Sequence, residues 1–211
     1  MRLFALLAIN LLRLTVATPF SSSPDALTSH DTLSAITWTS PITWTLPIVE
    51  GGANYTFTGT IEEVVDQVNH ERAKLGIEPI DDSFDETETP DYSAAHKRTY
   101  IDSDCKQGLG GPASDQRIRS GINYLKKLKT TCRNGPGPLN CGRISCSWNS
   151  AIYWCNDKAT DSQVYDCSMF AEYAQHVRDK CGYKQGKNHH LVWGQARDTD
   201  DFRVVVGSDS C

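Results

Sequence analysis

The cysteines are the side chains of this 211-residue chain whose number and spacing most directly indicate chemistry. All eight lie in the second half of the chain, at Cys105, Cys132, Cys141, Cys146, Cys155, Cys167, Cys181 and Cys211. In an oxidising secretory route, an even number of cysteines within about a hundred residues indicates a disulfide framework. We therefore predict that all eight pair as disulfides, with a connectivity that the spacing leaves open.

A zinc site is the alternative use of these cysteines. Cys141 and Cys146 are close in the sequence, and His176, His189 and His190 are available as further ligands. Zinc sites usually show paired Cys-x-x-Cys or Cys/His spacings, and the chain contains no such pair. We therefore expect no bound metal and no other cofactor.

Two titratable side chains, Glu172 and His176, have a spacing that suits acid–base catalysis. On a helix they would share a face, and His189 and His190 could complete the general acid and base that RNA cleavage needs. The alternative is that Glu172 and His176 are solvated on a helix and that His189 and His190 belong to a polar loop. No Gly-x-Ser-x-Gly or His-Glu-x-x-His motif occurs. A non-enzymatic function is preferred, with a secreted ribonuclease as the enzymatic alternative.

Basic side chains are candidates for contact with a target. Lys126, Lys127 and Lys129 lie on the polar side of a predicted helix. They could meet anionic membrane headgroups or an acidic patch on a receptor. The alternative is an ordinary solvated helix face.

Aromatic side chains are the other candidates for target contact. Trp148, Tyr153, Trp154 and Trp193 could stack on chitin or another glycan, or anchor a protein partner, because Trp and Tyr supply large contact areas. The alternative is that they fill the core. Of the four, Trp154 joins the three lysines in the predicted target-binding set.

The first residues have the composition of a secretory signal peptide. Arg2 precedes a short apolar run, which ends in small residues near Ala17. A transmembrane helix would need about 20 apolar residues, and Asn10 and Arg13 interrupt this run. We predict a signal peptide over residues 1–17 and a secreted, extracellular product.

Lys97-Arg98 is the only Lys-Arg dipeptide in the chain and stands a few residues before the first cysteine. The preceding residues 81–91 are acidic and polar, as is typical of extended, accessible segments. We predict that a kexin-type protease cuts after Arg98, so that residues 18–98 are an acidic pro-segment and residues 99–211 the mature domain. The alternative is a surface dibasic pair that no protease uses.

The two predicted parts differ in charge. Residues 18–98 contain 14 acidic and 4 basic side chains, whereas residues 99–211 contain 12 acidic and 15 basic ones. Opposite charge would attract the pro-segment weakly to the mature domain, unless the acidic residues serve only solubility.

The pro-segment also contains an N-glycosylation sequon at Asn54 and an amphipathic helix predicted over residues 60–76, which opens with a capping box. A lone helix of this length needs a surface to pack on, and we expect the mature domain to provide it. The pro-segment would then act as a folding aid or a temporary cover.

The order of elements in residues 99–211 indicates an α+β fold. Hydrophobic periodicity predicts helices over residues 114–129 and 166–182. It predicts strands over residues 142–155, as a pair, and over 191–196 and 202–207. We predict a small disulfide-rich domain in which an antiparallel sheet has two helices on one face.

Part of the chain resembles a known group of secreted proteins. The runs 134–138, 141–147 and 149–157 are similar to a motif of small cysteine-rich proteins that filamentous fungi secrete, some of which are counted as candidate effectors. The order of elements and the final run 206–211 also resemble the α/β-sandwich killer toxins and, more loosely, the extracellular necrosis-inducing effectors. Killer toxins of that class are thought to act on ion channels through a basic surface residue, but no motif assigns that role to a position here.

These resemblances imply a secreted fungal effector or toxin that acts outside the producing cell. It would bind a host or competitor target and could induce cell death. The expected partners are the kexin-type protease during secretion and a receptor, membrane protein or glycan of the target, with no nucleic-acid partner and a monomeric mature protein. The alternatives are a ribonuclease-like toxin and a chitin-binding protein.

Overall fold

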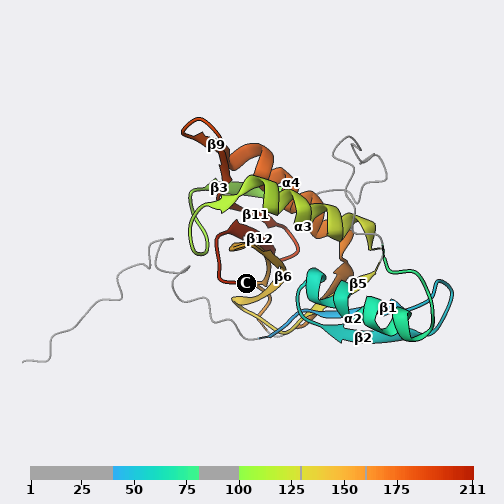
Figure 1. The fold of residues 1–211 in the computed structure, drawn as a ribbon. Helices are drawn as coiled ribbons and strands as arrows, with labels where there is room; N and C mark the ends of the chain where they lie inside the picture. Colours follow the sequence, from blue (N-terminus) through green and yellow to red (C-terminus); the bar gives the residue numbers. More distant parts are fainter. Residues whose placement is uncertain (1–39, 81–99, 129, 160) are drawn as a thin grey trace, which may run out of the picture.

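The computed structural model describes residues 40–80, 100–128, 130–159 and 161–211 (Figure 1). We call residues 40–80 the N-terminal segment and residues 100–211 the cysteine-bearing part. The predicted signal peptide, the predicted processing pair Lys97 and Arg98, and Lys129 lie outside the described residues.

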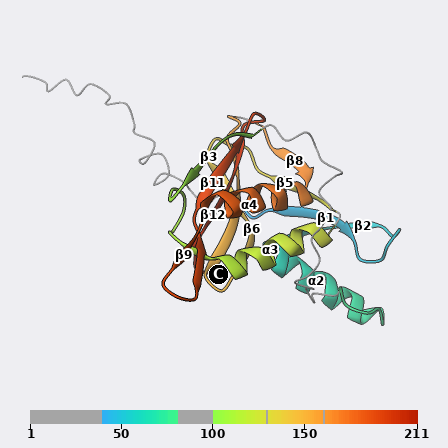
Figure 2. The ribbon, with the colours of Figure 1, turned by 90° about the horizontal axis from the view of Figure 1, so that it is seen from above.

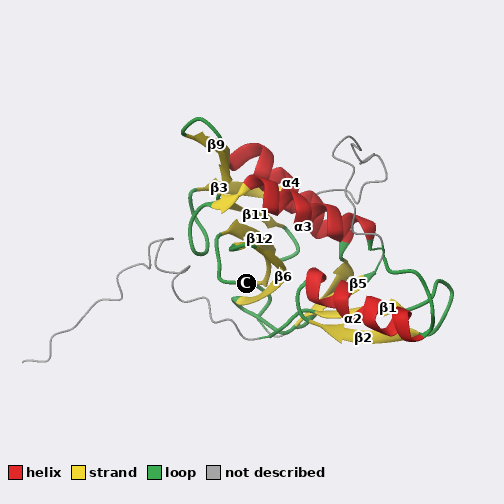
Figure 3. Ribbon diagram, viewed as in Figure 1, coloured by secondary structure: helices red, strands yellow, loops and turns green. Residues whose placement is uncertain are grey.

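The described helices all fall where the hydrophobic periodicity predicts them (Figure 3). They are α2 (Ile61–Lys74), α3 (Asp115–Lys127) and α4 (Ser168–Cys181). The capping box that opens α2 is confirmed, since the backbone N–H of Thr60 donates to Glu63 Oε2 at 2.8 Å and that of Glu63 donates to Thr60 Oγ1 at 3.4 Å. The cap satisfies backbone groups that the helix itself leaves unpaired.

Short strands connect and flank these helices, and they form three antiparallel sheets. The strands are β1 (Thr43–Pro47), β2 (Asn54–Thr58), β3 (Tyr100–Cys105), β4 (Ala113–Ser114), β5 (Thr131–Asn134), β6 (Asn140–Ser147), β7 (Ser150–Asn156), β8 (Gln163–Asp166), β9 (Gly182–Gln185), β10 (His189–Val192), β11 (Gly194–Asp198) and β12 (Phe202–Gly207). The sheet orders are β3-β11-β12-β7-β6, β2-β1-β5-β8 and β4-β10-β9.

Strands β7 and β12 of the five-stranded sheet are buried on both faces, and they show which side chains point to each face. On β7, Ile152 and Trp154 belong to the main core cluster, whereas Tyr153 belongs to a second cluster. The same alternation on β12 assigns Val204 to the main cluster and Val205 to the second. Successive side chains of a strand point to opposite faces, so one face of this sheet lies in the main core and the other in the second cluster.

The structure differs from the predicted layout of one sheet with two helices. Helices α3 and α4 pack along each other and contact strands of the five-stranded sheet, and α2 of the N-terminal segment contacts α3 and β6 (Figure 2). The described residues therefore form a small disulfide-rich α+β structure with three helices and three sheets. The additional strands, such as β5 and β8, are too short to show a periodicity of their own.

The N-terminal segment shares the main hydrophobic core with the cysteine-bearing part. Strand β1 lies between β2 of its own segment and β5 of the other part. Trp44 of β1 and Val64 of α2 are fully buried in the same cluster as Ile122 of α3 and Phe170 of α4. Helix α2 thus packs on the cysteine-bearing part.

The predicted disulfides are confirmed: all eight cysteines are paired, and every bond joins two residues of the cysteine-bearing part. The pairs are Cys105–Cys181, Cys132–Cys167, Cys141–Cys155 and Cys146–Cys211. Two of the bonds attach α4 to strands at its two ends, one links the neighbouring strands β6 and β7, and one fixes the C-terminus to β6. Such cross-links stabilise a small fold by restricting the unfolded chain.

Replacement of Trp44 tests whether the N-terminal segment is part of this core. The Trp44 side chain is 0% exposed and its Nε1 donates to the carbonyl of Gly59 at 2.8 Å, so Trp44→Ala leaves a large cavity. We expect a loss of about 3–5 kcal/mol in the free energy of unfolding of the full chain, measured by denaturant titration. Tyr55→Ala on the adjacent strand β2 is the control, because Tyr55 is 50% exposed and should change stability little. Equal effects of the two substitutions would contradict the described packing.

Candidate functional site

Trp148 is the most exposed of the large hydrophobic side chains among the described residues, at 75%. It lies in the two-residue turn between β6 and β7, whose last paired residues are Ser147 and Ser150. Trp148 and Asn149 both have left-handed backbones, with φ of 48° and 58°. A bulky residue in this conformation costs about 1–2 kcal/mol, whereas Asn tolerates it well.

Several contacts hold this turn in place. The Arg117 guanidinium of α3 lies 4.8 Å from the centroid of the Trp148 ring, within the range of a cation–π interaction. The disulfide Cys146–Cys211 fixes the strand just before the turn, and the backbone N–H of Asp209 donates to the carbonyl of Asn149 at 3.3 Å. We call Trp148, Asn149 and Arg117 the hairpin tip: an exposed indole and a cation on a cross-linked support.

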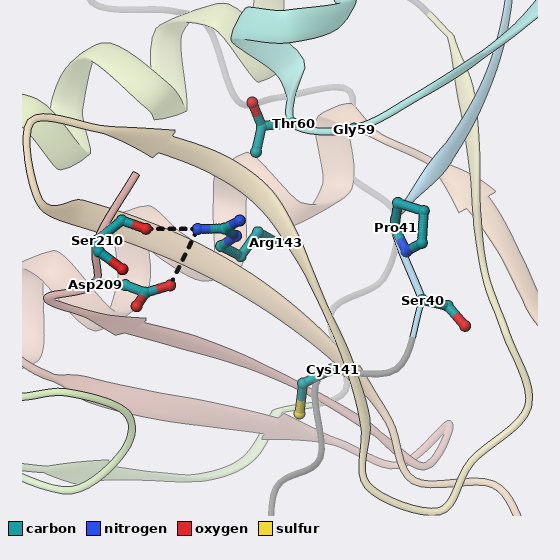
Figure 4. Close-up of a pocket in the computed structure, with 8 residues that line it drawn as sticks. All are labelled: Ser40, Pro41, Gly59, Thr60, Cys141, Arg143, Asp209 and Ser210. Atoms are coloured by element: carbon teal, nitrogen blue, oxygen red, sulfur yellow. Dashed lines mark hydrogen bonds and ion pairs between the residues drawn. The ribbon is translucent and has the colours of Figure 1, made fainter.

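A polar pocket of about 550 Å³ lies at the junction of the N-terminal segment and the cysteine-bearing part (Figure 4). Its lining comes from both parts: Ser40, Pro41, Gly59, Thr60, Cys141, Arg143, Asp209 and Ser210.

Arg143 is the cation of this pocket, and its charge is already paired. Its Nη1 donates to the carbonyl of Ser210 at 2.7 Å and to Asp209 Oδ2 at 3.3 Å (Figure 4). Asp209 also accepts the hydroxyl hydrogen of Tyr153, and burial together with this bond raises the pKa of Tyr153. The network fixes the C-terminal residues and leaves no isolated charge for an anion.

Glu62 of α2 is the main polar contact between the two parts. Its Oε1 accepts from Ser145 Oγ at 2.6 Å, and its Oε2 accepts from the backbone N–H of Cys146 at 3.0 Å. Burial raises the pKa of Glu62 above its ordinary value, although these hydrogen bonds act in the opposite direction. A carboxylate is thus held in the interface at a cost in desolvation.

The predicted target-binding set needs one correction. Trp154 is 0% exposed and stacks on Phe170 at 4.3 Å between ring centroids, so it is a core residue and cannot contact a target. Lys127 is exposed at the end of α3. Lys126 is half-buried there, and burial lowers its pKa to about 8. Trp148, which is exposed, therefore replaces Trp154 as the aromatic candidate for target contact.

The other two aromatic candidates also contribute mainly to the interior. Tyr153 is fully buried on the second face of the five-stranded sheet. Trp193 is partly buried, and its Nε1 is a buried donor.

The residues proposed for acid–base catalysis lie in different surroundings. His176 Nε2 is 2.8 Å from Ser103 Oγ of β3, and Glu172 interacts electrostatically with Lys126 of α3. His189 is exposed on β10, and His190 lines a second pocket that does not include the other three. Neither pocket brings Glu172 and His176 together with His189 or His190, the combination expected for RNA cleavage.

Further predictions concern glycosylation, metals and membranes. Asn54 is exposed at the start of β2, so its sequon is accessible. Among the described residues, no group of three or more His, Cys, Asp or Glu side chains is placed to hold a metal ion. Within the same ranges, no helix combines the length and the hydropathy of a membrane span.

Comparison with known proteins finds no matching family model, no matching curated protein and no matching solved structure.

The raised pKa of Glu62 predicts a pH dependence of stability. Because the folded pKa lies above the unfolded one, the carboxyl stabilises the fold most below its unfolded pKa, and this contribution is lost as the pH rises through the folded value. We expect Glu62→Gln, which cannot titrate, to lose less stability than the parent chain in denaturant titrations as the pH rises from the ordinary pKa of 4.5 through the folded value. Asp66→Asn, an exposed position on the same helix, should follow the parent. The same pH slope for parent and Glu62→Gln would contradict the assignment.

Proposed function

We propose that the chain is the precursor of a secreted fungal effector or toxin that acts outside the producing cell by binding a host or competitor target. The signal-peptide-like start, the dibasic pair and the similarity of residues 134–157 to a motif of secreted fungal proteins support this proposal. The four disulfides support it as well, because cross-linked small domains persist in oxidising, protease-rich surroundings.

The exposed Trp148 is the observation that carries the binding function. The fold holds this side chain in a backbone conformation that disfavours it and leaves three-quarters of it in water. Both features cost free energy, and strained residues of this kind cluster at functional sites. Trp and Arg are also the residue types most enriched among the energetic hot spots of protein interfaces.

The hairpin tip favours a protein receptor over a flat glycan surface. A sugar ring stacks on the open face of an indole, and Arg117 already lies over one face of the Trp148 ring. The remaining face and the guanidinium donors suit a partner that offers both an apolar pocket and an acidic group. Lys127 is exposed at the other end of α3.

Substitution of Trp148 tests this proposal. We expect Trp148→Asn to reduce cell death in infiltrated leaves or growth inhibition of competitor cells at least about tenfold, because a hot-spot side chain contributes about 2 kcal/mol or more. Its stability should stay within about 1 kcal/mol of the parent, since relief of the left-handed strain offsets the lost cation–π contact. The activity is read from dose–response curves of purified protein and the stability from denaturant titrations.

Val164→Ala is the matched control, because Val164 is also an exposed apolar side chain, at 54%, on another strand. It should retain full activity. Unchanged activity of Trp148→Asn would overturn the assignment of the hairpin tip. RNA cleavage by the parent that is lost in His176→Ala would favour the ribonuclease alternative, and retention on chitin beads that depends on Trp148 would favour the glycan alternative.

A further inference from the structure

The two parts of the chain are joined by a backbone ladder. Strand β1 pairs with β5 in antiparallel register, with Trp44 opposite Cys132 and Thr45 opposite Thr131. Beside this ladder, Thr130 Oγ1 donates to the carbonyl of Thr45 at 2.6 Å. The N-terminal segment therefore completes a sheet of the cysteine-bearing part and covers an edge that β5 would otherwise expose.

Close apolar packing accompanies the ladder. A Cβ at Gly142 of β6 would come within 2.4 Å of the Ile42 side chain, so the absence of a side chain at Gly142 lets Ile42 pack directly on the strand. Ile42 is fully buried, as are Ile61 and Val68 of α2. Each of these side chains would return to water if the segment left, at the usual cost of exposing apolar surface.

The interface also contains a polar contact, between Glu62 of α2 and two donors of β6. Ser145 Oγ and the backbone N–H of Cys146 both donate to the Glu62 carboxylate. Gly121 of α3 allows this arrangement, because a Cβ there would lie 2.2 Å from Ser145 Oγ. Departure of α2 would exchange these two hydrogen bonds for bonds to water, at a modest net cost for each bond.

No disulfide connects the two parts. All four bonds join residues between Cys105 and Cys211, so the covalent link from residue 80 to residue 100 runs only through residues 81–99. A cut within that link removes the peptide connection but none of the contacts named above.

We infer that the N-terminal segment stays bound to the cysteine-bearing part after cleavage at Lys97-Arg98, so that the mature secreted species is a two-chain protein held together without a covalent bond. This inference rests on the proposed processing and replaces the expectation of a temporary cover. The second chain supplies half of the lining of the pocket beside Arg143, which is incomplete without it.

The test uses the full chain, secreted by a host that lacks kexin and then cut with purified kexin. Denaturing mass spectrometry reports the cut, and size-exclusion chromatography with native mass spectrometry reports whether the two products remain together. We expect one species with the summed mass of both chains, and the same species on dilution to nanomolar concentration. Elution of the cut chains as separate species would overturn the inference.

Failure of the predicted processing is distinguishable from failure of the inference. If kexin leaves Lys97-Arg98 uncut, the processing prediction is wrong, and a variant with another protease's recognition sequence in place of residues 85–91 allows the same measurement. Binding of the N-terminal segment to the cysteine-bearing part is measured without any target, so the result does not depend on the effector activity.

Variants of Glu62 test the interface itself. Glu62→Ala leaves Ser145 and Cys146 without their acceptor, and we expect it to raise the Kd of the cut chains at least about tenfold. Glu62→Gln keeps an acceptor oxygen without the charge and should restore most of the affinity, and Asp66→Asn should leave the Kd unchanged. A Glu62→Ala protein that dissociates no more readily than Asp66→Asn would contradict the role of this contact.

Discussion

The antiparallel pairing of β1 with β5 is the constraint on which the rest of the structure depends. It joins two stretches of chain that differ in composition, charge and cysteine content, and it places Trp44 in the same core as α3 and α4. The ladder adds to the contacts of Glu62 and of the apolar face of α2 that hold this helix beside β6, since a helix of its length is marginal alone in water. The N-terminal segment is therefore an integral part of the folded core.

The disulfides all lie within the cysteine-bearing part, and one of them, Cys132–Cys167, anchors the strand β5 on which β1 pairs. Together they cross-link strands β3, β5, β6 and β7, helix α4 and the C-terminus, and none reaches the N-terminal segment. The cross-linked region is also where the chain holds Trp148 in a left-handed turn. A fold can keep such a strained and exposed side chain only if the surroundings determine its position, and here a disulfide and a bond from Asp209 do so on one side.

Much of the fold could be predicted from sequence because its helices and longer strands have local periodicity. All three described helices, the β6–β7 hairpin and β12 lie where apolar spacing places them. The pairing of β1 with β5 could not be predicted, since strand partners distant in sequence leave no local pattern. The same limit explains Trp154: its alternation in a strand shows that it faces one side, but only the packing of α4 shows that this side is buried. Among the aromatic candidates, Trp148 could have been preferred to Trp154 from sequence, because a two-residue turn that joins two strands usually lies at the surface.

Burial makes the charge of Glu62 unfavourable, so the presence of a carboxylate in this interface needs a physical reason. Its hydrogen bonds offset only part of the solvation that the carboxylate loses on burial. What a carboxylate adds is position: its two oxygens meet one hydroxyl and one backbone N–H, and a shift of α2 along β6 would break both bonds. Apolar contacts tolerate such a shift far better, because they have little directional preference. The contact is thus best understood as setting the register of the N-terminal segment on the sheet, while the strength of the association comes from the β1–β5 ladder and the shared core.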